Sequence, residues 1–446
     1  MAKIKYFKID TSSLKEDELD VIEILKEVAK EIHKIWEQQV NPTTGKISLY
    51  DEGITREEVI QASETDSDIL SPYTVVRRGD DGSLYAVPYT EEYKEDIKKI
   101  ILLLKGVEQV SKDFGFKKYI RNIYRAWERG DFETALVEYL KNDNNKIGIL
   151  IGPVETYADK LLGIKRAFQF NLRIRREKET VEAEKMISIS KELPIVKPFL
   201  SIARQMGEDK IFMRVDDVLI FSGRQAGTMS ASTNLPNSSD AVRKYGTRVV
   251  VYANSLDYKF TTLFLPLLKS ITGAGFEFNS KSLKLATCRL ILLHEISEGL
   301  IKFPDTVSRL KGNETVYREL NAYLMGLKSS SYHMLKGLIT QREYEEIVVM
   351  LLVIGMDKLS RMDSDTSVFE YARGFVVVFN YLIHTKAISV SKVKIKINIS
   401  KVSQSIDVLS SVVLSVFHES NYEQSQKIFD EYGSFDVSKR MPLTKK

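Results

Sequence analysis

Segments with the pattern of β-strands are concentrated in roughly the first 260 residues of this 446-residue chain. Two β-rich runs flank Asp80-Asp81-Gly82, which is typical of a β-hairpin, and residues 248–253 form a further strand-like run. After Tyr258, apolar residues recur mainly at helical spacing, and only residues 392–399 alternate like a short strand. This segregation predicts an α+β fold with two lobes, one mixed and one mainly helical.

Two further segments give definite expectations for secondary structure. Residues 16–39 carry apolar side chains at helical spacing, and turn-forming residues follow at 41–45, so we expect an amphipathic helix that ends there. The pattern between residues 160 and 192 is also read as helical.

The numbers of charged residues and cysteines argue against several classes of function for this protein. The 65 basic residues are nearly balanced by 61 acidic ones and are interspersed with them, which does not favour nucleic acid as a partner. The single cysteine, Cys288, excludes an intrachain disulfide and a cysteine-rich zinc site. The N-terminus has no apolar run typical of a signal peptide, and no apolar run is long enough to span a bilayer. We expect a cytoplasmic protein without a membrane partner.

An apolar helix predicted between Leu283 and Leu300 contains His294, Glu295 and Glu298. In zinc peptidases, a helix of this kind carries two histidines four residues apart, so that both imidazoles lie on one face. A glutamate after the first histidine serves as general base to the metal-bound water. Here the first histidine and the glutamate are present, but Glu298 stands where the second histidine would be.

Several motifs along the chain resemble those of the dipeptidyl peptidase III family, peptidase family M49. Ile151 to Gly163 reads IGPVETYADKLLG and resembles the family signature IGPxExYxDxLxG. Asn234 to Asn237 (NLPN), Val316 to Leu320 (VYREL) and Phe379 to Leu382 (FNYL) resemble further family segments in the same order. The chain is thus identified as a divergent member with degraded zinc motifs, and the likeness extends from about Ser13 to Tyr432.

The resemblance implies a mixed β-rich lobe and a mainly helical lobe separated by a cleft. The mixed lobe is expected to comprise residues 1–172 and 218–262, and the helical lobe residues 173–217 and 263–446. In the family, the cleft positions of the mixed lobe bind the substrate. The matching residues here, expected to hold the free amino terminus of a peptide, are Glu155, Asn234 and Asn237. One carboxylate and two amide oxygens suit the three donors of an ammonium group; alternatively, these residues only satisfy backbone groups in a turn.

The catalytic positions are conserved only in part. Tyr157 matches a family tyrosine that hydrogen-bonds the reacting carbonyl, and Glu295 matches the general base, both expected to be vestigial. An ungapped alignment assigns the third metal-ligand position to Ser329, the neighbouring acidic position to His333, and a family histidine position to Tyr371. One histidine, a serine and a substituted carboxylate make a poor zinc site, so we expect no bound cofactor.

Two alternatives remain open for the metal position. In the first alternative, a rearranged site for zinc or another divalent metal is formed by His294, Glu298 and His333. In the other, Glu298 and His333 pair with each other inside an inactive site. Our leading hypothesis is a catalytically inactive pseudopeptidase that binds a peptide or protein segment in the cleft. The rival hypotheses are an active metal-dependent dipeptidyl peptidase and a scaffold protein that uses an outer surface.

Overall fold

The computed structural model describes most of the chain in two compact units. The first unit comprises residues 1–176 and 216–230, and the second comprises residues 177–215 and 231–446. The described residues are 3–40, 49–156, 158–205, 210–236, 239–272, 279–301, 303, 305–362, 368–391, 394–419 and 421–434. The turn predicted at 41–45 lies outside them.

The first unit combines helices with an antiparallel sheet. Its helices are α1 (Glu16–Val40), α2 (Arg56–Ala62), α3 (Tyr89–Glu92), α4 (Lys94–Val110), α5 (Phe114–Glu128), α6 (Phe132–Asn142) and α9 (Arg224–Thr228). Its strands are β1 (Lys5–Tyr6), β2 (Thr74–Arg78), β3 (Leu84–Pro88), β4 (Ile147–Glu155), β5 (Ala167–Arg175) and the last part of β6 (Ile211–Gly223). Strand β5 lies between β4 and β6, and β1 pairs with β6.

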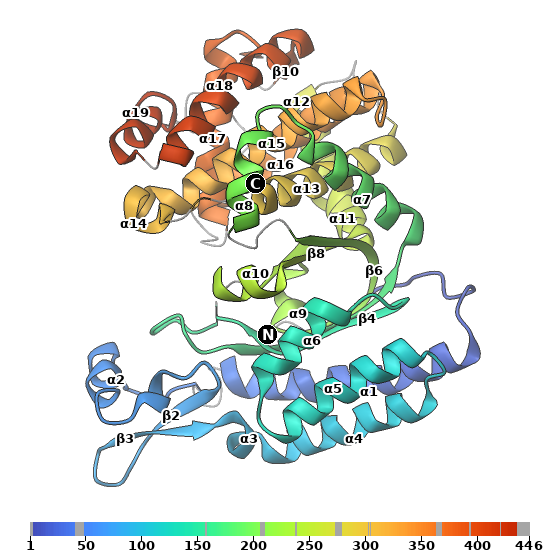
Figure 1. Ribbon diagram of the computed structural model, residues 1–446, viewed down its shortest axis with the longest axis vertical. Helices are drawn as coiled ribbons and strands as arrows, with labels where there is room; N and C mark the ends of the chain where they lie inside the picture. Colours follow the sequence, from blue (N-terminus) through green and yellow to red (C-terminus); the bar gives the residue numbers. More distant parts are fainter. Residues whose placement is uncertain are drawn as a thin grey trace. The chain divides into compact units, whose positions relative to one another are not determined.

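Helix α1 confirms the amphipathic pattern read from the sequence. Figure 1 shows α1, α4 and α5 side by side in blue and cyan, and α1 also packs on β5. The Gln39 side-chain oxygen accepts the backbone N–H of Phe168 at 2.8 Å, and the Ser222 hydroxyl donates to the carbonyl of Ala29 at 2.5 Å. These buried bonds fix the helix to the sheet because each satisfies a polar group that water cannot reach.

The predicted hairpin is present, but one predicted helix is not. Strands β2 and β3 pair antiparallel around the turn at Gly82, as expected from the sequence. Between residues 160 and 192, however, the chain forms the strand β5 before a helix begins at Glu177. The buried polar side chains of β5 misled the helical assignment; Arg173, for example, forms ion pairs with Asp143 and Asp216 at 2.7 and 2.8 Å.

The second unit is mainly helical. Its helices are α7 (Glu177–Lys191), α8 (Leu200–Gln205), α10 (Ser239–Tyr245), α11 (Ala253–Lys259), α12 (Leu265–Thr272), α13 (Ser280–Leu300), α14 (Thr306–Leu310), α15 (Glu314–Leu335), α16 (Gln341–Arg361), α17 (Phe369–His384), α18 (Ile399–Glu419) and α19 (Tyr422–Tyr432). Its strands are the first part of β6, β7 (Ser232–Leu235), β8 (Thr247–Tyr252), β9 (Ile388–Ser391) and β10 (Lys394–Ile397). The β9–β10 hairpin and the strand β8 agree with the strand-like runs in the sequence.

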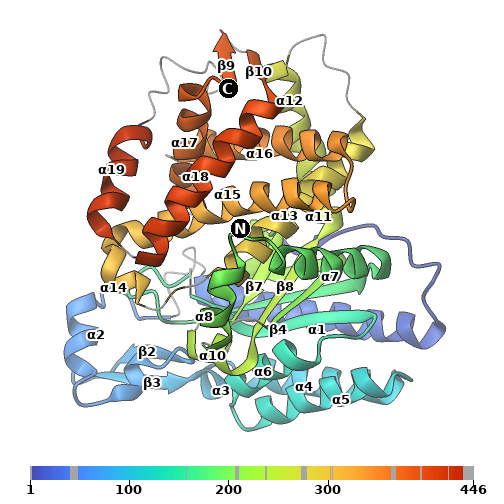
Figure 2. The ribbon, with the colours of Figure 1, turned by 45° about the horizontal axis from the view of Figure 1, so that its top comes forward.

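Close contacts between helices build the core of the second unit, which Figure 2 shows in yellow, orange and red. A Cβ on Gly374 of α17 would lie 3.0 Å from the backbone nitrogen of Leu320 in α15. A Cβ on Gly355 of α16 would lie 2.1 Å from the ring of Phe375 in α17. Both positions require glycine because the helices approach so closely that a side chain has no space.

The compact units differ from the predicted lobes in three segments, of which 173–176 and 216–217 are short and fall in the first unit. The sequence resemblance assigns residues 231–262 to the mixed lobe, whereas they belong to the second unit. The reason is local packing: β8 and α11 both contact α13.

Among the described helices, α18 is long and apolar enough to cross a membrane by length and composition alone. A single helix of this kind does not indicate a membrane span, because core helices of soluble proteins meet the same criterion. One face of α18 is buried around Val402, Ile406 and Leu409.

Candidate functional site

Helix α13 carries the His-Glu pair of the predicted metal motif. The Asn279 side chain caps its first turn by accepting the backbone N–H groups of Lys281 and Ser282. Helix α15 packs against it, and Gly326 of α15 faces the backbone of His294. As a result, His294, Glu295 and several side chains of α15 and its neighbours meet within the second unit.

Glu295 is engaged by two neutral donors from strand β7. The Ser232 hydroxyl donates to Glu295 Oε1 at 2.8 Å, and the Asn234 side-chain amide donates to Oε2 at 3.1 Å. Both carboxylate oxygens therefore accept a hydrogen bond from the sheet. Only 9% of Glu295 is exposed, so these bonds replace hydration of the carboxylate.

His294 faces Glu319 from α15. Its Nε2 lies 3.2 Å from Glu319 Oε2, which is an ion-pair distance. Burial alone would lower the pKa of the imidazole, but Glu319 and Glu295 outweigh it, so the pKa of His294 is raised. The pair is enclosed, with 7% of His294 and 4% of Glu319 exposed.

Glu298 pairs with an arginine. Its Oε1 lies 3.3 Å from Nε of Arg318, whose guanidinium also lies 4.0 Å from Glu314. Burial, together with the charges of Glu319 and Glu295, raises the pKa of Glu298 to about 7 even though Arg318 acts in the opposite direction. This carboxyl group therefore exchanges its proton near neutral pH.

A lysine from α16 completes the cluster. Lys358 donates to the Tyr323 hydroxyl at 3.2 Å, and its ammonium lies 3.6 Å from the ring centre of Tyr371. That distance is typical of a cation–π contact. Burial lowers the pKa of Lys358 to about 8, although Glu319 and Glu295 favour the charged form. Strongly perturbed ionisable groups gathered in one place are typical of functional sites.

The residues of this cluster do not fit a zinc ion. A zinc site needs at least three strong ligands directed at one point. Here His294 faces Glu319, whereas Glu298 is turned to the guanidinium of Arg318. A divalent ion bound to Glu298 would meet that guanidinium at close range, where two positive charges repel.

The predicted rearranged metal site is not assembled. Across the described part of the chain, no set of three or more His, Cys, Asp and Glu side chains is arranged to hold a metal ion. Nε2 of His333 lies 3.2 Å from both the Ser190 hydroxyl and the Met186 carbonyl. Its pKa is lowered to about 4, mainly by burial, so His333 is a neutral core residue.

The structure also corrects the third ligand position. The ungapped alignment assigned it to Ser329, but the carboxylate that faces His294 belongs to Glu319, earlier on the same helix. The sequence did contain a signal: Glu319 to Ala322 matches the ExxA part of the family motif EExxA, with Arg318 in place of its first glutamate. Lys358 carried no motif and was missed. Tyr371, read as a substituted histidine, lies 6.1 Å from His294 between ring centres.

The predicted residues of the signature segment lie in the first unit. Glu155 is buried at the end of β4, whereas Tyr157, like Asn237 of the second unit, lies outside the described residues. The next acidic residue of the signature segment, Asp159, organises the following loop. It accepts hydrogen bonds from four backbone N–H groups and from the Tyr50 hydroxyl, all at 2.9 to 3.1 Å.

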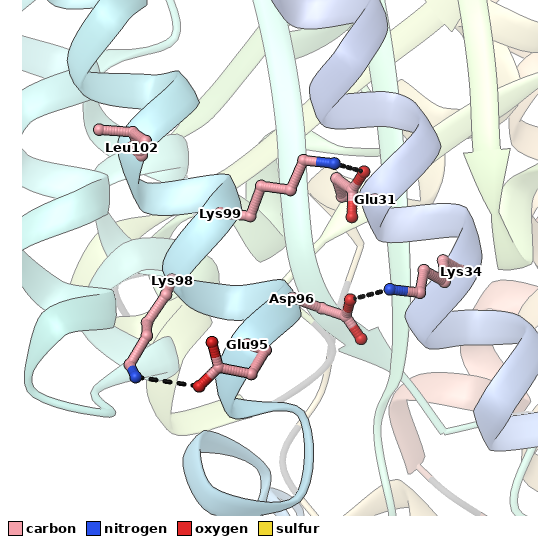
Figure 3. Close-up of a pocket in the computed structure, with 7 residues that line it drawn as sticks. All are labelled: Glu31, Lys34, Glu95, Asp96, Lys98, Lys99 and Leu102. Carbon is pink, nitrogen blue, oxygen red and sulfur yellow. Dashed lines mark hydrogen bonds and ion pairs between the residues drawn. The ribbon is translucent and has the colours of Figure 1, made fainter.

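A surface hollow of about 460 Å³ lies between α1 and α4. Figure 3 shows that its charged side chains pair with each other across and along the two helices. Lys99 lies 2.5 Å from Glu31, and Lys98 lies 3.0 Å from Glu95. The Lys98–Glu95 pair is solvent-exposed, whereas Glu31 and Asp96 are buried and each is neutralised by a lysine of the facing helix. Since every charged side chain of the hollow is already paired within it, we do not regard the hollow as the functional site.

No family model matches the chain. A curated relative, Nudix hydrolase 3 of Arabidopsis thaliana, is 22% identical over 409 residues, which cover 90% of this chain and 52% of that protein. The chain thus spans about half of the length of this relative.

Two solved structures are similar over almost the whole chain. Dipeptidyl peptidase III from Caldithrix abyssi superposes with a TM-score of 0.80 and 21% identity, covering 96% of this chain and 92% of that one. Dipeptidyl-peptidase III from Corallococcus sp. strain EGB has a TM-score of 0.74 and 20% identity, covering 97% and 91%. Together with the mixed first unit and the helical second unit, these likenesses show that the chain has the two-lobed α+β fold of dipeptidyl peptidase III.

Proposed function

We propose that this protein binds a peptide or protein segment through its free amino terminus and does not hydrolyse it. The two similar solved proteins are dipeptidyl peptidases by name, and this supports a peptide as the class of ligand. The amino-terminal preference follows from Glu155 and Asn234, which match family positions that hold the substrate ammonium.

The absence of hydrolysis rests on the state of Glu295. A general base in a metallopeptidase needs an open carboxylate oxygen beside a metal-bound water. Each oxygen of Glu295 already accepts one hydrogen bond, from Ser232 or from Asn234, so part of its acceptor capacity is used within the protein. Its neighbours His294 and Glu298 face Glu319 and Arg318, so they do not present ligands to a common point.

Asn234 remains suited to ligand binding while it holds Glu295. Its amide nitrogen donates to Glu295 at 3.1 Å, which leaves the amide oxygen as an acceptor with a defined orientation. An ammonium group is a donor only, so it prefers an amide oxygen whose nitrogen is already engaged elsewhere. Glu295 would thus fix the orientation of Asn234 for ligand binding instead of acting as a general base.

The test uses peptides of five randomised residues with a fluorophore at the C-terminus. Binding is measured by fluorescence anisotropy, and the same mixtures are analysed by mass spectrometry for released dipeptides. We expect binding to weaken about tenfold or more when the amino terminus is acetylated, because a charged donor is lost. Glu155→Gln and Asn234→Ala are expected to weaken binding of the free peptides to a similar extent.

The matched control is Asn142→Ala, which removes an exposed side-chain amide that donates to Glu138. This variant is expected to bind like the parent protein. Equal binding of free and acetylated peptides would contradict the proposed mode of binding. Dipeptide release that depends on added zinc and disappears in Glu295→Gln would contradict the absence of hydrolysis.

A further inference from the structure

Three carboxylates gather beside His294 in the second unit. Glu295, Glu298 and Glu319 are each largely buried, and the charges of Glu319 and Glu295 act on Glu298. Buried carboxylates at close range repel each other, and without compensation they take up protons or bind a cation. In a metallopeptidase a metal ion supplies that compensation.

Two cationic side chains lie among these carboxylates. Arg318 reaches Glu298 with its Nε at 3.3 Å and extends toward Glu314. Lys358 enters from α16 and is held by the Tyr323 hydroxyl and the face of Tyr371. Neither cation comes from the helix that carries His294, so both depend on the packing of α13 against α15 and α16.

The way in which Lys358 is held leaves its charge available to the cluster. No carboxylate lies within ion-pair distance of its nitrogen in the described part of the chain. Its oxygen partner is a neutral phenol and its aromatic partner is neutral as well. The ammonium therefore acts through space on Glu319 and Glu295 together.

We propose that Lys358 and Arg318 are resident cations that replace a metal ion in balancing Glu295, Glu298 and Glu319, so that the centre excludes divalent metals. With the imidazole of His294, three groups that can carry positive charge face three carboxylates. The cluster is thus an ion-pair centre that needs no metal for its stability, and removal of one resident cation converts it into a cation-binding site.

This inference deepens the proposed function, because it names what takes the place of the metal, but its test is independent of peptide binding. The variant is Lys358→Met, which preserves length and removes the charge. Metal content is measured by equilibrium dialysis against zinc or manganese followed by elemental mass spectrometry. Thermal unfolding is followed in the same metals and in EDTA by circular dichroism.

The parent protein is expected to retain less than about a tenth of a metal ion per chain, with the same melting temperature in zinc and in EDTA. Lys358→Met is expected to approach about one ion per chain, and metal is expected to raise its melting temperature by several degrees. Adding His294→Ala to this variant is expected to abolish the uptake. The matched control is Lys336→Met, because Lys336, like Lys358, lies over a tyrosine ring but is exposed and pairs with a carboxylate, Glu192, at 3.1 Å.

A second pair of variants keeps the test decisive if Lys358→Met does not fold. Lys358→Arg preserves the charge and is expected to behave like the parent. Arg318→Glu removes the other resident cation at a partly exposed position and is expected to raise metal uptake about tenfold or more. A stoichiometric metal in the parent protein that is lost in His294→Ala would overturn the proposal. So would folded variants without Lys358 or Arg318 that bind no more metal than the parent.

Discussion

Two lysines, one in each unit, show how the same charge serves different purposes; Lys165 is buried and Lys358 is partly buried. Burial lowers the pKa of both Lys165 and Lys358 to about 8. Lys165 is fully buried and donates to three oxygens at 2.6 to 2.8 Å. These oxygens belong to Ile69, Ser71 and Thr74. Lys358 has one phenol oxygen at 3.2 Å and an aromatic face.

The difference lies in what satisfies each ammonium. The three donors of the Lys165 ammonium each meet an acceptor, so its position is fixed by directed bonds, and its backbone N–H also donates to Asp159. Lys358 is positioned by packing on Tyr371, while its charge acts on surrounding carboxylates. Replacing Lys165 should therefore break bonds, whereas replacing Lys358 should change a charge balance.

The largest effect should come from Lys165→Met. The substitution leaves three buried acceptors without their donor, and each unsatisfied group costs on the order of 1–3 kcal/mol. We expect a loss of about 3–5 kcal/mol in the free energy of unfolding of the first unit. Both tryptophans of the chain, Trp36 and Trp127, lie in this unit, so urea denaturation followed by tryptophan fluorescence reports on it directly.

Lys160→Met is the matched control for this prediction. Lys160 is exposed on the same loop, and surface substitutions of this kind change stability by only about 0.5 kcal/mol or less. If both variants unfold at the same urea concentration, the directed bonds of Lys165 do not stabilise the first unit.

The second largest effect should appear in the pH dependence of the second unit. The pKa of Glu298 is about 7, above its ordinary value of 4.5, because of burial and neighbouring carboxylates. The folded state therefore binds this proton more tightly than the unfolded state, and the free energy of unfolding falls as the pH rises from about 4.5 to about 7. The raised pKa of His294 acts in the same direction. We expect a loss on the order of 1–3 kcal/mol between pH 5 and pH 8.

Thermal unfolding by circular dichroism at pH 5 and pH 8 measures this loss, and Glu298→Gln should remove most of it. The first unit should respond oppositely. Burial would raise the pKa of Asp159, but backbone N–H groups and the Tyr50 hydroxyl lower it below its ordinary value. Its contribution is therefore present above about pH 4 and lost as the pH falls further. If Glu298→Gln loses as much stability between pH 5 and pH 8 as the parent protein does, other groups cause the pH dependence of the second unit.

Local patterns in the sequence were sufficient to predict much of the fold. The apolar spacing between residues 16 and 39 predicted α1, and the turn at Asp80-Asp81-Gly82 predicted the β2–β3 hairpin. Strand β5 was missed because Gln169, Asn171 and Arg173 interrupt its apolar pattern. These side chains are fully buried in the structure, and partners distant in the sequence make that possible.

The candidate site was predictable only where a motif marked it. His294 and Glu295 stood out as an adjacent pair, but Glu319 was missed because the alignment assumed constant spacing beyond Val316. Lys358 lies near the end of a helix, where lysine is common on the surface. Only the packing of α16 against α13 and α17 shows that it belongs to the cluster, and such contacts between distant segments leave no local trace in the sequence.

The smallest effect should come from Ser232→Ala, which removes one of the two hydrogen bonds that hold Glu295. Because Asn234 still donates to the other carboxylate oxygen, and Ser232 is only partly buried, water can replace the lost hydroxyl. We expect a loss of about 1 kcal/mol in the free energy of unfolding of the second unit, measured by circular dichroism in urea. Ser188→Ala is the control, since that exposed hydroxyl donates only to its own helix at Glu184. If Ser232 and Asn234 support Glu295 cooperatively, the loss in the free energy of unfolding would instead approach about 3 kcal/mol, the upper end of the range expected between pH 5 and pH 8. Ser232 would then stabilise the second unit as much as the charged members of the cluster do.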